Sequence, residues 1–213
     1  MKNILLISDG IPGHFNQSKG VASILSKTHP SNIHLTELSF KIHQLRGPIT
    51  VFSRILMRLP NKLTANLVSF MYSSIETNGI DLIIAAGGKT APYSAAIKVL
   101  NNIPVIQLGS PRGLHSSLFN ALVTVERYYE DSSNIIASIT PNLYSPEICS
   151  KAATEKKLSE HLLFLIGGEG IGYAYKDQEW TSLVASIRNL YSKTSLPITI
   201  VTSRRSDPKV ENI

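Results

Sequence analysis

Short apolar runs alternate with segments of helical periodicity along most of this chain. The runs at 4–7 and 80–86 lack polar alternation, which is typical of strands buried on both faces. The predicted strands are 4–7, 33–38, 80–86, 104–108, 121–125, 135–139, 162–166 and 198–201. The predicted helices are 17–27, 49–59, 63–76, 93–100 and 177–192. Because strands and helices alternate, we expect an α/β fold with a parallel, doubly wound sheet.

A polar segment with several lysines interrupts this pattern at 144–160. We interpret it as a linker or a short connecting helix between a first domain at 1–143 and a second unit at 161–213. The second unit shows only strand, helix and strand, and two strands rarely bury enough surface to be stable. It is therefore either a small appendage or part of a second domain.

Composition narrows the class of protein. Apolar residues make up 43% of the 213 residues and charged residues 17%, which is a globular balance. No window reaches the roughly 18 apolar residues of a membrane-spanning helix. The run at 4–7 is shorter than the roughly 7–15 apolar residues of a signal peptide. A single cysteine, Cys149, excludes a disulfide framework. We expect a cytoplasmic protein, soluble or peripheral at a membrane surface.

Positive charge is concentrated in one section. No Asp or Glu occurs between Leu38 and Ile75, whereas five basic residues do: Lys41, Arg46, Arg54, Arg58 and Lys62. Such a section binds an anionic partner or is simply the solvated face of helices. Apolar residues at helical spacing between these charges suit an anionic membrane surface. Only Phe52 interleaves an aromatic ring with the charges, so we expect no nucleic acid.

The loop after the first strand carries candidate acid–base chemistry. It reads Ser8-Asp9-Gly10-Ile11-Pro12-Gly13-His14-Phe15-Asn16-Gln17. Asp9 and His14 are able to transfer protons near neutral pH, and ligands of open α/β sheets bind outside the carboxyl ends of strands. The alternative is a plain turn in which Asp9 bonds its own backbone.

A second glycine turn, Gly87-Gly88-Lys89-Thr90, follows the third strand. It resembles the end of a P-loop, but Ile83 stands where that motif needs its first glycine, so the motif fails. The turn still opens a helix, whose free N–H groups attract an anion. A tight turn with a surface lysine is the alternative interpretation.

Two candidate phosphate contacts lie in the second unit. Gly167 and Gly168 begin a glycine-rich loop after a strand, and Ser203, Arg204 and Arg205 follow the last strand. The alternative interpretation of Arg204 and Arg205 is that both side chains are exposed on a loop and bind no ligand. The six histidines show no metal-binding spacing, so we expect no metal site.

Taken in order, several motifs resemble the elongated-mitochondria (mitochondrial fission) family and its bacterial relatives. The motifs are Ser8-Asp9-Gly10-x-Pro12-Gly13-His14-x-Asn16-Gln17, Gly88-Lys89-Thr90-Ala91-Pro92, Gln107 with Pro111-Arg112, Phe164-Leu165-Ile166-Gly167-Gly168 and Thr202-Ser203-Arg204-Arg205. The segment at 125–131 departs from the family pattern because it lacks a histidine. Family sequences continue beyond the last motif, so the chain is expected to hold an incomplete second domain.

The resemblance implies a GT-B-like fold of two Rossmann-like domains facing a cleft. It implies a glycosyltransferase with a nucleotide-sugar donor, a saccharide or lipid-linked acceptor and no further cofactor. Asp9 or His14 would be the general base. The substrate or phosphate contacts would be Gly10, Gly13, Asn16, Gln17, Gly87, Gly88, Lys89, Thr90, Gly167, Gly168, Ser203, Arg204 and Arg205. The alternative is a non-catalytic adaptor, because the plant member recruits a dynamin-related protein to the mitochondrial outer membrane.

Overall fold

The computed structural model describes residues 1–156, 160–168, 172–203 and 206. It separates into two compact units, Met1–Pro146 and Glu147–Ile213, and each is described by itself. The helix α5 (Pro146–Lys156), which belongs to the second unit except for its first residue, occupies most of the segment that the sequence suggested as a linker or connecting helix.

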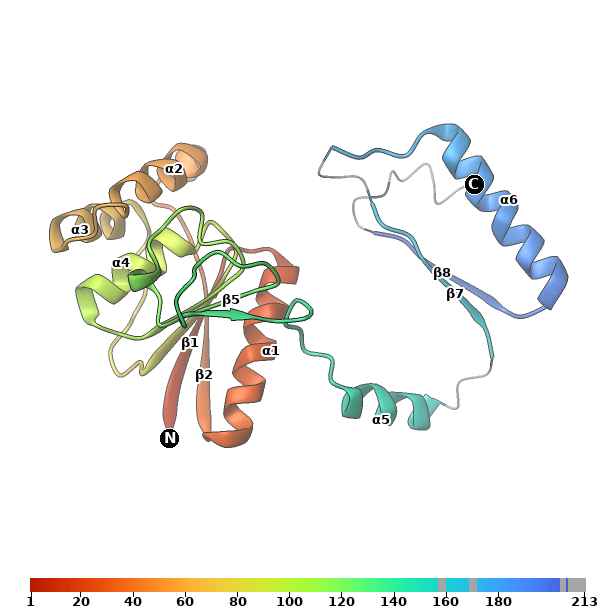
Figure 1. Cartoon of the computed structure of the whole chain (residues 1–213), viewed down its shortest axis with the longest axis horizontal. Coiled ribbons are helices and arrows are strands. Elements are labelled where there is room, and N and C mark those ends of the chain that lie inside the picture. Colours follow the sequence, from red (N-terminus) through yellow and green to blue (C-terminus); the bar gives the residue numbers. More distant parts are fainter. Residues whose placement is uncertain (157–159, 169–171, 204–205, 207–213) are drawn as a thin grey trace. The chain divides into compact units, whose positions relative to one another are not determined.

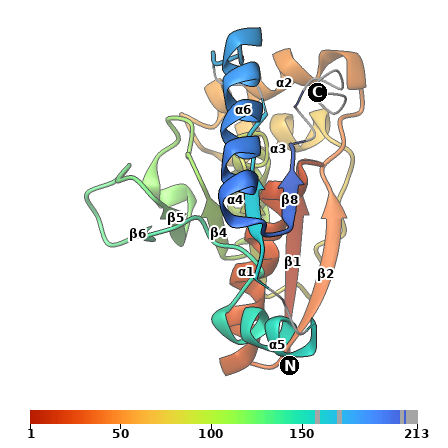
Figure 2. The ribbon, with the colours of Figure 1, turned by 90° about the vertical axis from the view of Figure 1, so that its right-hand side faces the viewer.

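A six-stranded parallel sheet forms the centre of the first unit. Its strands are β1 (Lys2–Ser8), β2 (Ser31–Glu37), β3 (Leu82–Ala86), β4 (Val105–Leu108), β5 (Ala121–Thr124) and β6 (Asn134–Ile136). Their order is β2-β1-β3-β4-β5-β6, and every neighbouring pair is parallel. Figure 2 shows β4, β5 and β6 following one another toward the edge opposite β2. The expected parallel, doubly wound α/β sheet is therefore confirmed.

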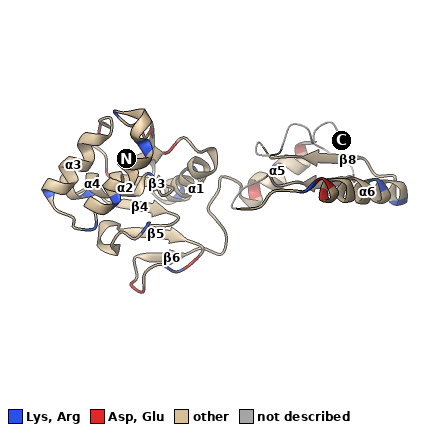
Figure 3. Cartoon of the chain, turned by 90° about the horizontal axis from the view of Figure 1, so that it is seen from above, with Lys and Arg blue, Asp and Glu red and all other residues tan. Residues whose placement is uncertain are grey.

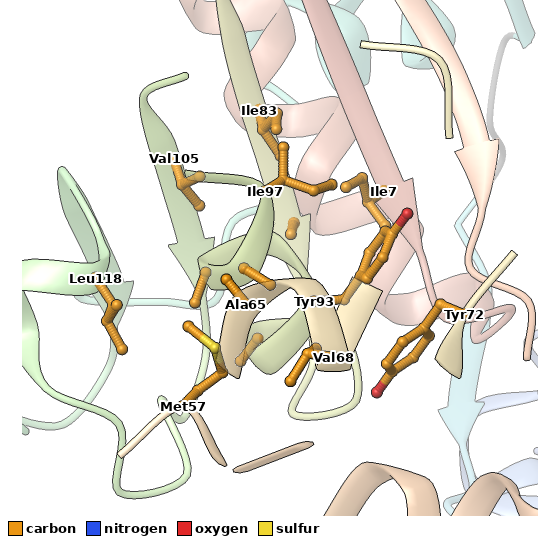
Figure 4. Close-up of a cluster of buried hydrophobic side chains, with 14 of the residues drawn as sticks. Ile7, Met57, Ala65, Val68, Tyr72, Ile83, Tyr93, Ile97, Val105 and Leu118 are labelled. Carbon is orange, nitrogen blue, oxygen red and sulfur yellow. The ribbon is translucent and has the colours of Figure 1, made fainter. Parts of the chain in front are cut away.

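Helices cover both faces of this sheet (Figure 1). One face packs against α1 (Pro12–Thr28), and the other against α2 (Arg46–Leu56), α3 (Lys62–Met71) and α4 (Ala91–Asn101). Strand alternation divides β1 accordingly: Ile4 and Leu6 face α1, whereas Leu5 and Ile7 join the larger core on the α4 side. Figure 4 shows that larger core, with Met57, Val68 and Tyr93 among its side chains.

Helix α1 begins five residues earlier than the periodicity predicted. Pro12 is its first residue, and proline suits that position because its ring fixes φ and its missing N–H would have no helical partner there. His14, Asn16 and Gln17 consequently lie on the first turns of a helix rather than in a loop. Their side chains are thus held by a regular backbone.

Helix α3 ends at Met71 instead of continuing to residue 76 as predicted. Tyr72 adopts an extended backbone and forms an antiparallel bridge with Phe40. Its ring is fully buried and lies 4.8 Å from the rings of both Phe40 and Tyr93, measured between centroids. The long-range aromatic packing of Tyr72 ends the helix, and no local signal in the sequence announces it.

The second unit has a two-stranded parallel sheet, β7 (Leu162–Leu165) with β8 (Ile198–Val201), and the connecting helix α6 (Asp177–Thr194). Trp180 and Ile187 are the buried residues of α6. The ring of Trp180 lies 4.4 Å from that of Tyr175, which in turn contacts Tyr173 edge to face at 5.0 Å. These aromatic rings give the small unit much of its packed interior.

Candidate functional site

The carboxyl ends of β1 and β3 form a topological switch point. β1 pairs with β2 on one side and with β3 on the other, so the connections from β1 and β3 leave toward opposite faces of the sheet. Helices α1 and α4 begin at this edge, each with a proline in its first turn and without a side-chain cap. Open α/β sheets bind ligands at such points, and uncapped helix starts present free N–H groups to them.

Asp9 and His14 meet at this edge as a hydrogen-bonded pair. His14 Nδ1 lies 3.0 Å from each carboxylate oxygen of Asp9. The Asp9 side chain is only 2% exposed, whereas that of His14 is 31% exposed. Within the described part of the chain, Nε2 of His14 has no hydrogen-bond partner. A buried carboxylate that holds one ring nitrogen leaves the other for proton transfer with a ligand.

The Gly87 turn lies directly against this pair. Gly87 has φ +90°, and a Cβ placed on it would lie 2.4 Å from His14 Nδ1 and 2.9 Å from Asp9 Oδ2. Its carbonyl accepts hydrogen bonds from the Gln107 amide at 3.1 Å and from the Thr90 hydroxyl at 2.8 Å. Gly87 is therefore required both for the left-handed turn and for the close approach of His14.

Thr90 has a structural role in this turn. Its side chain is fully buried, and its hydroxyl also lies 3.1 Å from the Ala86 carbonyl. Its hydroxyl satisfies backbone carbonyls inside the protein, and contact between Thr90 and phosphate stays a prediction. The neighbouring Lys89 is exposed and remains available to a ligand.

Two arginines surround the next residue, Gly88. Arg54 of α2 donates from Nη2 to the Gly88 carbonyl at 3.1 Å. A Cβ on Gly88 would lie 2.4 Å from Nε of Arg112, a residue of the loop after β4. Burial lowers the pKa of Arg54, and the charge of Arg112 lowers it further. Arg54, one of the basic residues that the sequence grouped as a membrane-facing section, thus reaches the strand ends.

The remaining predicted residues of the first loop frame this edge more loosely. Gly10 has φ +79° and lies against the Glu37 carboxylate, while Gly13 is exposed with open space around it. Asn16 and Gln17 are half-buried on α1. A cavity of about 320 Å³ opens beside the loop, lined by residues of β1, α1 and β2: Ser8, Gly10, Ile11, Pro12, Phe15, Leu35, Thr36 and Glu37.

The other predicted contacts belong to the second unit. Gly167 and Gly168 follow β7, and Ser203 follows β8, so parallel pairing places them at one edge of that sheet. A cavity of about 640 Å³ adjoins the end of β7 and α6, with Tyr173 and Tyr175 in its lining. Arg204 and Arg205 lie outside the described residues.

The first-unit site is completed by three residues to which the sequence assigned no role at the strand ends. Gln107 is fully buried beneath the Gly87 turn, and Ser94 donates to its amide oxygen at 3.3 Å. Arg112 was visible only as part of a motif, and Arg54 only as one of several basic residues. A buried glutamine in an apolar strand is the one local signal that could have been used.

Among the residues that the structure describes, no three His, Cys, Asp or Glu side chains gather closely enough to hold a metal ion. None of the helices in that part of the chain is both long and apolar enough to cross a bilayer.

Comparison with solved structures supports the fold. UDP-GlcNAc 2-epimerase from Methanocaldococcus jannaschii is similar, with a TM-score of 0.53 and 12% identity over 100% of this chain and 68% of that chain. MurG from Acinetobacter baumannii gives a TM-score of 0.43 and 14% identity over 99% of this chain and 68% of that chain, a likeness too low to support an argument. At these identities only fold is compared, and the α/β, GT-B-like class is confirmed.

Comparison with curated proteins gives no match. The profile of the family described as mitochondrial fission ELM1 matches residues 12–213. Because this match spans nearly the whole chain, including His14 and the Gly87 turn, the protein belongs to the mitochondrial fission ELM1 family.

Proposed function

We propose that this protein is a glycosyltransferase that uses a nucleotide-sugar donor and activates its acceptor through His14. The observation that carries the proposal is the Asp9–His14 pair, in which a carboxylate that is only 2% exposed lies 3.0 Å from Nδ1 of a half-buried histidine. The pair lies at the switch point of the sheet, where ligands of such folds bind.

In the proposed reaction, Nε2 of His14 accepts the proton of an acceptor hydroxyl. The hydroxyl oxygen forms a bond to the anomeric carbon of the sugar, and the bond from that carbon to the nucleoside diphosphate breaks. Asp9 keeps the proton of His14 on Nδ1 and stabilises the imidazolium that forms. Gly167, Gly168 and Ser203 are the described candidates for contact with the donor diphosphate.

The test is turnover by the purified protein. We would measure nucleoside diphosphate release from a panel of UDP-, GDP-, ADP- and dTDP-sugars in the presence of mixed saccharide and lipid-phosphate acceptors. We expect release that depends on both donor and acceptor and is lost in His14→Ala. Folded protein that neither binds nor consumes any donor would contradict the proposal, as would full activity of His14→Ala.

A second candidate function is docking on an anionic membrane, through a surface that we call the α2–α3 face. Seven apolar side chains of this face are 47–76% exposed: Val51, Phe52, Ile55, Leu59, Leu63, Leu67 and Phe70. The charged residues beside them are all basic, and Figure 3 marks Lys and Arg but no Asp or Glu on α2 and α3. Apolar side chains surrounded by basic residues suit a bilayer with anionic lipid.

Docking is tested by co-sedimentation with vesicles of phosphatidylcholine and phosphatidylglycerol. The double variant Arg58→Glu/Lys62→Glu should bind far more weakly than the wild type, because both residues are exposed and each substitution replaces a positive charge with a negative one. Lys27→Glu is the matched control, an exposed lysine on α1, and should bind nearly as the wild type. Equal binding by all three proteins, or none by the wild type, would exclude this docking surface.

A further inference from the structure

Arg54 and Arg112 converge on Gly88 without a compensating negative charge. Ion pairs in the described ranges are Lys2–Asp81, His14–Asp9, Arg127–Glu130 and Lys151–Glu155. Neither guanidinium of the arginine pair therefore lies within 4.0 Å of a described carboxylate. The Nε atom of Arg54 is buried and has no hydrogen-bond partner in this part of the chain. Two like charges held together in this way disfavour each other unless an anion binds.

The backbone holds both arginines at this point. Arg54 is fixed by its bond to the Gly88 carbonyl, and Arg112 adopts the left-handed conformation, with φ +57°. Residues with a side chain rarely adopt that conformation, so the surrounding loop imposes it on Arg112. The uncapped start of α4 lies three residues after Gly88 and adds free N–H groups of the same polarity.

We propose that Arg54 and Arg112 form a binding subsite for a phosphate ester, and that this ester is part of the acceptor. A phosphate monoester carries nearly two negative charges at neutral pH and has three acceptor oxygens, so it matches two guanidinium groups. A single carboxylate would neutralise only one of them. The attribution to the acceptor rests on the proposed transferase function, whereas binding of the ester does not.

The position of the subsite supports that attribution. Gly87 contacts the Asp9–His14 pair and Gly88 contacts the arginine pair, and the Cα atoms of successive residues are about 3.8 Å apart. Because adjacent residues contact the two groups, a phosphate bound at the arginines would lie close to a hydroxyl bound at His14. A phosphorylated acceptor fits this arrangement, with its phosphate held beside its reacting hydroxyl.

The subsite is tested by calorimetric titration with hexyl phosphate, using hexanol as the uncharged control. We expect the wild type to bind the ester and not the alcohol, and Arg112→Gln to bind it about 10- to 100-fold more weakly, the usual effect of losing a charge-assisted contact. Arg127→Gln removes an exposed arginine elsewhere in the first unit and should bind as the wild type. Arg112→Lys keeps the charge and should show an intermediate loss, which provides a second reading if the glutamine variant unfolds.

Two further measurements distinguish binding of the phosphate ester from transferase activity, and a lipid phosphate from a soluble one. His14→Ala should bind hexyl phosphate normally, so loss of turnover in that variant leaves the subsite intact. Vesicles of phosphatidylcholine with phosphatidic acid test a lipid source. If Arg112→Gln loses both the soluble ester and the vesicles, the ester is lipid-borne; if it loses the soluble ester alone, the acceptor is soluble. Unchanged affinity of folded Arg112→Gln for hexyl phosphate, or no binding by the wild type, overturns the proposal.

Discussion

Gly87 and His14 are in contact so close that a Cβ on Gly87 would lie 2.4 Å from the Nδ1 atom of His14. Gly87 lies in the turn after β3 and His14 in the first turn of α1, which follows β1, and these two strands pair in the sheet. A residue without a side chain at position 87 is therefore a condition for the Asp9–His14 hydrogen bond. The catalytic proposal and the stability of this edge can both be examined through that contact.

Gly87→Ala should lower both stability and activity. The added methyl meets His14 and Asp9, and the positive φ of the residue disfavours alanine, so we expect a loss of about 1–3 kcal/mol in the free energy of unfolding. Gly47→Ala is the matched control, because Gly47 lies in α2 with open space around its Cα. Urea denaturation measures both variants, and equal stability of the two would contradict the contact.

Gly88→Ala should behave differently from Gly87→Ala. Its φ is not positive, and the atoms that a methyl would meet belong to the flexible Arg112 side chain. We expect a change of less than about 1 kcal/mol in stability, since surface side chains adjust readily, but weaker binding of hexyl phosphate. Calorimetry and denaturation of the same preparation separate the two effects. Tight ester binding with Arg112 displaced would argue against the subsite.

Thr90→Val should destabilise the protein without changing ligand affinity. The valine keeps the shape of the side chain but removes the hydroxyl that bonds the Gly87 and Ala86 carbonyls inside the turn. The expected cost is about 1–2 kcal/mol, and Thr90→Ser should recover much of it. If Thr90→Val instead reduced affinity for donor or phosphate at unchanged stability, the hydroxyl would be a ligand contact after all.

The Asp81 carboxylate should contribute to the stability of the fold at neutral pH and lose this contribution in acid. The Asn3 backbone N–H at 2.8 Å and the Lys2 ammonium at 2.9 Å lower the pKa of its carboxyl. A lowered folded-state pKa contributes stability above the ordinary carboxyl pKa of about 3.9, and this contribution is lost as the pH falls through the folded value. Asp81→Asn should thus lower the thermal midpoint at pH 7 and lower it by less at pH 3, which is below the ordinary carboxyl pKa. A difference of the same size at both pH values would contradict this assignment.

Sequence patterns were sufficient for elements whose signals are local. The apolar runs of β1 and β3 predicted buried strands, and their order along the chain predicted a parallel sheet. The end of α3 at Met71 was missed because Tyr72 is held by Phe40 and Tyr93, far away in sequence. Contacts of that kind leave no periodic trace.

The site residues also separate into those that the sequence could locate and those that required the tertiary structure. Asp9, His14 and Gly87 follow strands directly, so the rule for strand ends in open α/β sheets predicts their location. Arg54 could not be placed from sequence, because the helical pattern of α2 does not show that this residue reaches the carbonyl of Gly88 on another element. Gln107 likewise required the tertiary structure to show that its amide supports the Gly87 turn.

The most direct measurement of the central claim is acceptor-dependent kcat/KM for His14→Gln with a donor that the wild type accepts. Glutamine retains a polar side chain beside Asp9 but cannot act as a base near neutral pH, so kcat/KM should fall about 10²- to 10⁴-fold. Lys27→Gln, a change of an exposed lysine in the last turn of the same helix, should stay within about twofold, as expected for a surface substitution. A His14→Gln rate within twofold of the wild type would contradict the assignment of His14 as the general base.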